Sequence, residues 1–302
     1  MLWKRGRRSD NVVGADAGGG PRMPGGRGGM GIGGLLIVVV VALFLGKNPA
    51  ELLSLLGGGA GPTTQSDAPI DAAPQALPEN EETDFVRAIL GSTEDVWSKA
   101  FEGGRYPAPK LVLFSDSVSS ACGSATSSVG PFYCSGDQRV YLDTAFFNDM
   151  TRQLNAPGEF ARAYVIAHEV GHHIQNVTGV MQRTAKLRAQ GEEMEGADGL
   201  SVRQELQADC YAGVWANHAQ RQLQWLEAGD VESALNAATA IGDDRLQQQS
   251  RGQVVPDSFT HGSSAQRVRW FRIGMESGDA AATRLRCNGC NRNWRREGFN
   301  PR

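Results

Sequence analysis

Apolar and polar positions alternate along this chain in patterns that predict several helices and a small sheet. Between Asp84 and Glu102, apolar residues such as Phe85 and Ile89 recur at helical spacing and predict an amphipathic helix. Two short runs rich in β-branched and aromatic residues, Lys110–Ser115 and Gln138–Leu142, predict strands. The pattern indicates an α+β domain that is predominantly helical with a small sheet.

Two longer segments predict helices that carry polar groups in apolar surroundings. The first is Ala163–Asn176, with the sequence AYVIAHEVGHHIQN. The second is Ser201–Leu226, in which Leu206, Cys210 and Val214 recur every four residues and mark a buried stripe. Polar side chains within such helices are costly to bury unless they bind something.

The first of these helices contains a motif typical of zinc hydrolases. His168 and His172 are one turn apart on the same helix face, so their imidazoles can hold one metal ion. Glu169 lies between them and can act as a general base on a metal-activated water. Three of the chain's five histidines fall within six residues here. We therefore predict one catalytic Zn²⁺.

A catalytic zinc site needs a third protein ligand and an open position. Glu205 and Asp209 form an i, i+4 pair beside the apolar stripe of the second helix. We predict that Glu205 binds the metal and that Asp209 accepts the ring N–H of a ligating histidine. The alternative is that this pair belongs to a solvated helix face, where most charged residues lie.

His261 is the candidate for a second catalytic group, one that stabilises the oxyanion of a tetrahedral intermediate. It lies in a polar loop just before a helix predicted to begin near Ser263, where Ser263 and Gln266 fit a capping box. The alternative is an ordinary surface loop residue.

Three separated motifs, HEVGHH, ELQADCYAGVWA and FTHGSSAQRVRWF, resemble in their order the bacterial family of neutral zinc metallopeptidases. The resemblance runs from about Thr83 to Trp270. It implies a zincin-like fold that hydrolyses a peptide or protein substrate, with zinc on His168, His172 and Glu205 and with Glu169 as base. Extended peptides often add to a sheet edge, and the strand at 138–142 is our candidate for that edge.

The N-terminal third predicts a membrane anchor. Residues 1–29 are rich in Gly and Arg, and we expect them to be a disordered basic tail. Residues 30–46 carry no charge and, as a helix, would span roughly 26 Å, close to the thickness of a bilayer core. No clear cleavage site follows, which favours an uncleaved anchor over a signal peptide. Residues 47–82 form a flexible linker, and 83–302 the metallopeptidase domain.

Charge predicts the orientation of this anchor and argues against one class of partner. The first 29 residues carry six basic and two acidic side chains, so by the positive-inside rule the N-terminus is cytoplasmic and the domain extracytoplasmic. We therefore expect a single-pass protein of the inner cell membrane that contacts the lipid bilayer through residues 30–46. The chain has a net charge of −3. Its remainder is thus acidic, and we expect no nucleic acid partner.

Cysteine spacing agrees with an oxidising compartment. Cys122 and Cys134 bracket an 11-residue loop of mainly small residues, and Cys287 and Cys290 form a second close pair. Both pairs are disulfide candidates. The alternative for the second pair is half of a zinc knuckle or a redox pair. Cys210 is a small buried residue.

These features together predict a membrane-anchored zinc metallopeptidase. Two alternatives use the same residues: a zinc hydrolase of another envelope amide or ester bond, and a non-catalytic zinc-binding scaffold. The scaffold is disfavoured because it has no physical need for a base such as Glu169 beside the metal ligands.

Overall fold

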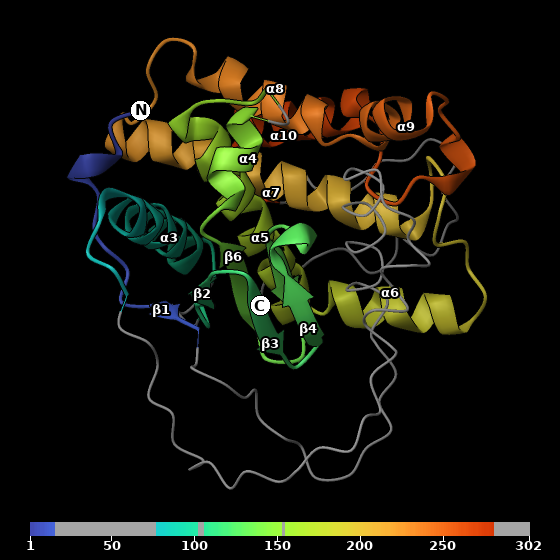
Figure 1. The fold of residues 1–302 in the computed structure, drawn as a ribbon, viewed down its shortest axis with the longest axis horizontal. Helices are drawn as coiled ribbons and strands as arrows, with labels where there is room; N and C mark the ends of the chain where they lie inside the picture. Colours follow the sequence, from blue (N-terminus) through green and yellow to red (C-terminus); the bar gives the residue numbers. More distant parts are fainter. Residues whose placement is uncertain (16–76, 102–105, 153–154, 281–302) are drawn as a thin grey trace, which may run out of the picture.

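The computed structural model describes residues 1–15, 77–101, 106–152 and 155–280 (Figure 1). Helices make up most of this part, with a small sheet on one side, which confirms the predicted α+β, predominantly helical class. The helices are α3 (Glu81–Ala100), α4 (Phe146–Arg152), α5 (Glu159–Val177), α6 (Val180–Ala189), α7 (Leu200–Leu223), α8 (Asp230–Ala240), α9 (Asp243–Arg251) and α10 (Ser264–Ser277), with 3-10 turns η1 (Trp3–Arg5), η3 (Ser127–Val129) and η4 (Pro256–Ser258). The strands are β1 (Val12–Gly14), β2 (Lys110–Phe114), β3 (Ser117–Ser120), β4 (Gly123–Thr126), β5 (Phe132–Cys134) and β6 (Arg139–Asp143).

Helix α5 is the centre of the fold and is buried on nearly all sides. It contacts α3, α7 and α8 and the strands β5 and β6, so both helices and sheet hold α5 in position. Gly171 lies where α7 crosses, and a Cβ there would come within 3.0 Å of the Cα and carbonyl oxygen of Ala208. The glycine inside the HEVGHH motif therefore brings the two metal-site helices together.

Helices α7 and α10 pack even more closely. A Cβ added at Gly274 would lie 2.0 Å from the carbonyl oxygen of Cys210, and one at Gly213 would lie 2.1 Å from that of Phe271. Two glycines thus allow backbone to meet backbone along this contact. The predicted stripe of Leu206, Cys210 and Val214 on α7 is buried, as expected.

The main sheet has the strand order β1-β2-β6-β5. Strands β1, β2 and β6 are parallel, whereas β5 runs antiparallel to β6, and β3 and β4 form a separate hairpin. Strand β6 overlaps the predicted segment 138–142 from Arg139 onward, but β2 and β5 cover both of its sides. Our expectation that this strand is an open sheet edge was therefore wrong, because long-range pairing with β2 occupies the side that the local pattern left open.

The prediction of a disordered tail over residues 1–29 is wrong for residues 1–15, which pack against the domain. Trp3 is 1% exposed, and β1 adds to the sheet beside β2. Composition did not predict this order because the few apolar residues of this segment pack against the domain instead of forming a core of their own. The rest of the predicted tail and the predicted membrane segment 30–46 lie outside the described residues. No helix within the described ranges is long and apolar enough to cross a membrane.

The predicted linker 47–82 lies mostly outside the described residues, and its last six residues already belong to the folded domain. The side chain of Asn80 accepts a hydrogen bond from the backbone N–H of Thr83 and caps α3. Acidic residues in the first turn favour the same start, which comes three residues before the predicted Asp84.

Cys122 and Cys134 form a disulfide, as predicted, which ties the β3–β4 hairpin to the end of β5. Cys134 is fully buried. Cys210 is buried and free, in keeping with its predicted packing role. Cys287 and Cys290 lie outside the described residues.

Candidate metal centre

Helices α5 and α7 bring His168, His172 and Glu205 together. Their metal-binding atoms all lie within 4.8 Å of one another. The Nε2 atom of His168 is 3.2 Å from Oε2 of Glu205, and that of His172 is 3.4 Å from Oε1 of the same carboxylate. The two imidazole planes are perpendicular. Histidine and carboxylate side chains in this two-to-one ratio are a zinc donor set.

Hydrogen bonds on the outer side of each ring fix which nitrogen faces the cluster. His168 donates from Nδ1 to Asp209, 2.8 Å away. The Nδ1 of His172 is 2.9 Å from Oε1 of Gln175. The amide NH₂ of Gln175 already donates to the carbonyl of Gln204 and to Gln207, so its Oε1 is the acceptor. Both histidines therefore hold a hydrogen on Nδ1, and both Nε2 atoms point toward the carboxylate, as a bound cation requires.

Asp209 is fully buried behind His168 and receives a second set of partners. Arg267 on α10 donates from Nε to Oδ2 and from Nη2 to Oδ1, each at 2.9 Å, and Tyr164 donates to Oδ1 at 2.5 Å. The Arg267 side chain is 3% exposed. Burial by itself would raise the pKa of Asp209, but Arg267 and His168 lower it to about 2. Asp209 thus remains an anion that holds the His168 ring in one orientation.

The pKa values of His168, His172 and Glu169 are all raised, those of the histidines by neighbouring charge and that of the glutamate by burial. Burial acts to lower the pKa of His168, but Asp209 and Glu205 outweigh it and raise the pKa to about 10. The pKa of His172 is also raised, against its burial, by Glu205. Burial raises the pKa of Glu169, although both histidines pull it down. A carboxyl whose pKa is raised toward neutrality is suited to accept and return a proton.

The loop that carries His261 packs against the start of α7. A Cβ at Gly262 would touch Val202 and Leu206, so the loop lies on the helix turns next to Glu205. Burial acts to lower the pKa of His261, but Glu205 and Asp243 raise it. The structure therefore brings His261 close to the cluster, where nearby carboxylates favour its protonated form, rather than leaving it in a surface loop.

Asp243, at the start of α9, shapes this loop. Its Oδ2 accepts the backbone N–H groups of three successive residues, at 2.6 Å from Thr260, 2.6 Å from His261 and 3.0 Å from Gly262. Its Oδ1 lies 3.4 Å from Nδ1 of His261. The predicted capping box at Ser263 is confirmed and starts α10 directly after the loop. Asp243 thus fixes both the backbone and the ring of His261.

The predicted metal-site and catalytic residues lie around this one centre, but four of its supporting residues were missed: Tyr164, Gln175, Asp243 and Arg267. Arg267 left a signal in the sequence. It occupies the buried face of α10 with Phe271 and Gly274, at helical spacing, where a cation is out of place without a buried anion.

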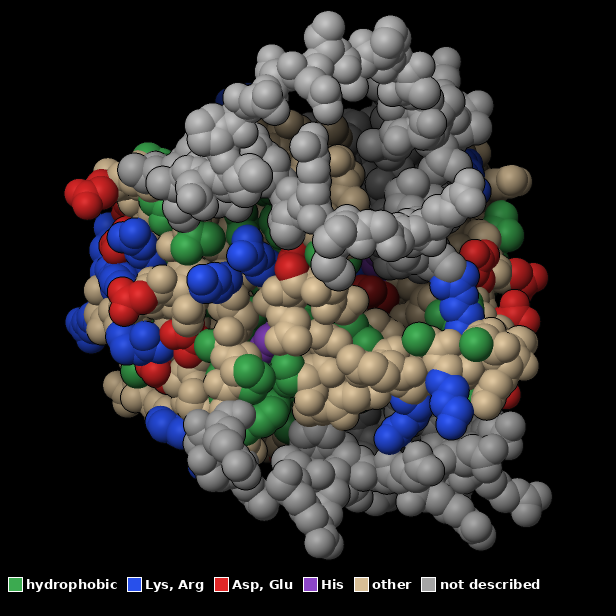
Figure 2. Space-filling model, turned by 90° about the horizontal axis from the view of Figure 1, so that it is seen from below, with side chains coloured by type: hydrophobic (Ala, Val, Ile, Leu, Met, Phe, Trp, Pro, Cys, Tyr) green, Lys and Arg blue, Asp and Glu red, His purple; other side chains and the backbone are tan. Residues whose placement is uncertain are grey.

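His173 directly follows His172 in the sequence but makes a different set of contacts. It is 1% exposed, and its Nε2 donates to the carbonyl of Pro107 while Nδ1 lies 3.1 Å from the hydroxyl of Tyr133. Burial lowers the pKa of His173 to about 4. A neutral ring held on both sides has a structural role. On the face of the molecule shown in Figure 2, acidic and histidine side chains can be seen within a hollow.

Zinc binding is expected to release about one to two protons per ion at pH 7. In the metal-free protein the pKa of about 10 keeps His168 protonated on the atom that faces Glu205, and the raised pKa of His172 favours the same state, so each ring loses its proton when it binds a cation. Titration calorimetry in two buffers of different ionisation enthalpy measures this number. A binding heat that does not depend on the buffer would contradict the prediction.

Comparison with known proteins identifies the family. The family described as "Putative neutral zinc metallopeptidase" matches residues 1–288. The uncharacterized protein YpfJ of Escherichia coli K12 is 47% identical over 291 residues, which cover 93% of this chain and 97% of that protein. The uncharacterized protein Rv2575 of Mycobacterium tuberculosis is also 47% identical, over 204 residues that cover 64% of this chain and 67% of that protein.

No solved structure matches this chain. The family match and the alignment with YpfJ each identify the family of this chain. With two histidines and a glutamate converging on one point, and both histidine rings hydrogen-bonded on their outer sides, the chain belongs to the neutral zinc metallopeptidase family.

Proposed function

We propose that this protein is a zinc-dependent peptidase that hydrolyses peptide bonds at the centre formed by α5, α7 and the His261 loop. The observation that carries the proposal is the convergence of His168, His172 and Glu205, with Glu169 buried beside them. A zinc ion held there would supply Lewis acidity and a water of lowered pKa. The protein's own residues supply the rest of the chemistry.

Glu169 is the proton carrier. It takes a proton from the attacking water and returns it to the leaving amine, so one carboxyl serves as base and then as acid. Its pKa, raised by burial, suits both steps, because the group must be ionised at the start and able to hold the proton afterwards.

His261 stabilises the negative charge that develops on the substrate carbonyl oxygen. Its pKa is raised by Glu205 and Asp243, which favours the protonated ring, and Asp243 holds the ring from the Nδ1 side. The Nε2–H is then free to donate toward the reacting carbonyl. A charged donor fixed before the reaction costs no reorganisation when charge appears.

The Cys122–Cys134 disulfide supports a location outside the reducing cytosol. We place the enzyme in an extracytoplasmic compartment on this ground. Substrates would then be peptides or proteins of the cell envelope, in keeping with the family's reaction class.

The proposal is tested on the full chain by zinc content and by hydrolysis of casein or peptides. Wild type should bind one zinc and lose cleavage when the metal is removed. Glu205→Gln should bind zinc about 10- to 100-fold more weakly, at least the loss typical of a residue behind the ligands. Stoichiometric zinc without cleavage would indicate another scissile bond, and absence of zinc would contradict the proposal.

A further inference from the structure

Residues 1–15, here called the N-terminal arm, lie against the domain that carries the metal centre. Trp3 is buried with its ring edge against Phe85 of α3, 5.3 Å between centroids, and its Nε1 donates to Glu159 at 2.8 Å. Glu159 is the first residue of α5, the helix that carries His168 and His172. The arm therefore contacts the two helices that border the sheet.

The arm also completes the sheet. Strand β1 pairs in parallel with β2, with Val12 opposite Leu111, Val13 opposite Val112 and Gly14 opposite Leu113. Backbone hydrogen bonds extend this ladder at both ends, from Leu111 N–H to Asn11 and from Ala15 N–H to Leu113. Backbone pairing of this kind requires the two segments to be in the same place, unlike a surface ion pair between long side chains.

Buried polar contacts hold the stretch between the tryptophan and the strand. The Ser9 hydroxyl, in a residue 1% exposed, donates to Glu94 at 2.6 Å, and Asn11 donates to the same carboxylate oxygen at 2.7 Å. Gly91 of α3 leaves room for the arm, since a Cβ there would lie 2.6 Å from the carbonyl oxygen of Arg7. Helix α3 is thus shaped to receive this segment.

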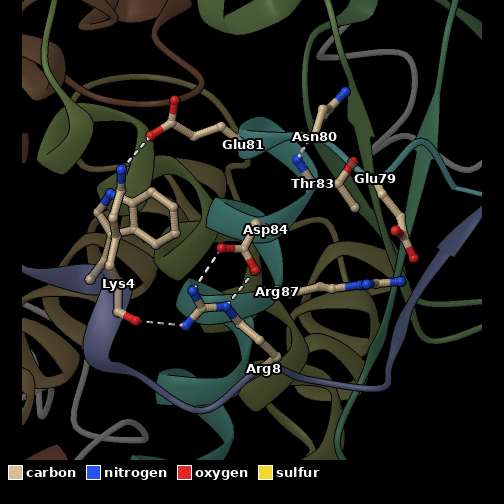
Figure 3. A pocket seen from close by; sticks show the side chains of 9 residues that line it. Lys4, Arg8, Glu79, Asn80, Glu81, Thr83, Asp84 and Arg87 are labelled. Atoms are coloured by element: carbon tan, nitrogen blue, oxygen red, sulfur yellow. Dashed lines mark hydrogen bonds and ion pairs between the residues drawn. The ribbon is translucent and has the colours of Figure 1, made fainter.

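Basic side chains of the arm meet acidic ones at the start of α3 (Figure 3). Arg8 makes two parallel hydrogen bonds to Asp84, at 2.6 and 2.7 Å, and Lys4 lies 2.7 Å from Glu81. Lys4 and Arg8 are among the basic residues whose charge predicts a cytoplasmic N-terminus in the sequence. In the fold their charge is matched by acidic side chains of the domain itself.

We propose that the N-terminal arm and the metal centre lie on the same side of any membrane that the chain contacts. Residues 15 and 77, which flank the segment outside the described part, belong to one folded body. A bilayer core about 30 Å thick cannot pass between β1 and β2 or between Arg8 and Asp84. Residues 15 and 77 would therefore lie on one side of the membrane, unlike the two ends of the single-pass anchor predicted at 30–46.

Two independent observations support this arrangement. The family match begins at residue 1, so the arm is part of the unit that the family shares. The Cys122–Cys134 disulfide assigns the shared side to an oxidising compartment. This inference concerns where the enzyme works and does not depend on its reaction.

The test is a zero-length cross-link between Lys4 and Glu81 in native membranes that contain the full chain. A water-soluble carbodiimide joins an amine to a carboxylate only when the two are in contact, and both side chains are accessible, at 70% and 72% exposed. Mass spectrometry of the band of monomer mass detects the joined peptides. Yields in intact membranes and in detergent extract are compared.

We expect equal yields in membranes and in detergent. A cross-link that forms only after detergent extraction would overturn the proposal, because the bilayer would then have kept the two residues apart. Failure in both would also overturn it, since the arm would not be docked. Lys4→Arg keeps the charge but removes the reactive amine and should abolish the product. Trp3→Ala keeps both reactive groups, removes the buried contact and should lower the yield severalfold in both preparations.

Discussion

Glu169→Gln is expected to lower kcat/KM for peptide hydrolysis by about 10²- to 10⁴-fold while leaving zinc bound, the range typical of a lost general acid–base group. Glutamine keeps the size and shape of the side chain but cannot take a proton from water. The three ligands and their partners Asp209 and Gln175 are untouched, so the metal should stay at wild-type stoichiometry. Initial cleavage rates and zinc content, measured on one preparation, check both halves of the prediction.

Glu192→Gln is the matched control. Glu192 is an exposed residue after α6, so this substitution makes the same chemical change away from the site. It should retain wild-type activity. Removing Glu169 should not destabilise the fold, because burial already disfavours its charged form. Full activity in Glu169→Gln would exclude this carboxyl as the base, whereas loss of zinc would assign it a part in holding the metal.

Arg267→Met is expected to lower the free energy of unfolding by about 3–5 kcal/mol, the usual cost of removing one partner of a buried ion pair. The substitution leaves the Asp209 carboxylate with no exposed surface and with His168 as its remaining cationic partner. Zinc affinity should fall by about 10- to 100-fold as well, since Asp209 orients the His168 ring. Urea unfolding of the metal-free protein separates the first effect from the second.

The double variant Arg267→Met/Asp209→Asn tests the cause. If the cost arises from an unpaired buried charge, neutralising Asp209 should recover part of it, and the two substitutions will not be additive. Arg267→Lys keeps the charge but cannot make the paired hydrogen bonds, and should fall between wild type and Arg267→Met. An unfolding midpoint of Arg267→Met equal to that of wild type would contradict the assignment.

The ion pair between Arg267 and Asp209 also predicts how acid affects the free energy of unfolding. The pKa of Asp209 is about 2 in the folded protein, below its usual value of 3.8. A depressed folded pKa contributes stability that is fully present above about pH 4 and is lost as pH falls toward 2. Without Arg267 the folded pKa should rise, so Arg267→Met should lose less additional stability over this interval than wild type. Urea unfolding midpoints at pH 5 and pH 3 measure the difference.

The sequence by itself determined the local part of the metal centre. The spacing of His168 and His172 is a property of one helix, and the burial of Leu206, Cys210 and Val214 follows from the same 3.6-residue period on another. Because both motifs lie in long periodic segments, Glu205 could be chosen as the third ligand without knowledge of the packing. The capping box at Ser263 is equally local, as it depends on residues three apart.

Only the tertiary structure decided which distant groups support that centre and where the chain's first residues lie. Arg267 reaches Asp209 because glycines let α10 approach α7, and Asp243 reaches His261 through a turn that no periodicity marks. Strand β1 pairs with β2 nearly one hundred residues later, and β2 and β5 together enclose β6 within the sheet. Composition and period describe neighbours along the chain, whereas these contacts depend on shape complementarity between separate elements.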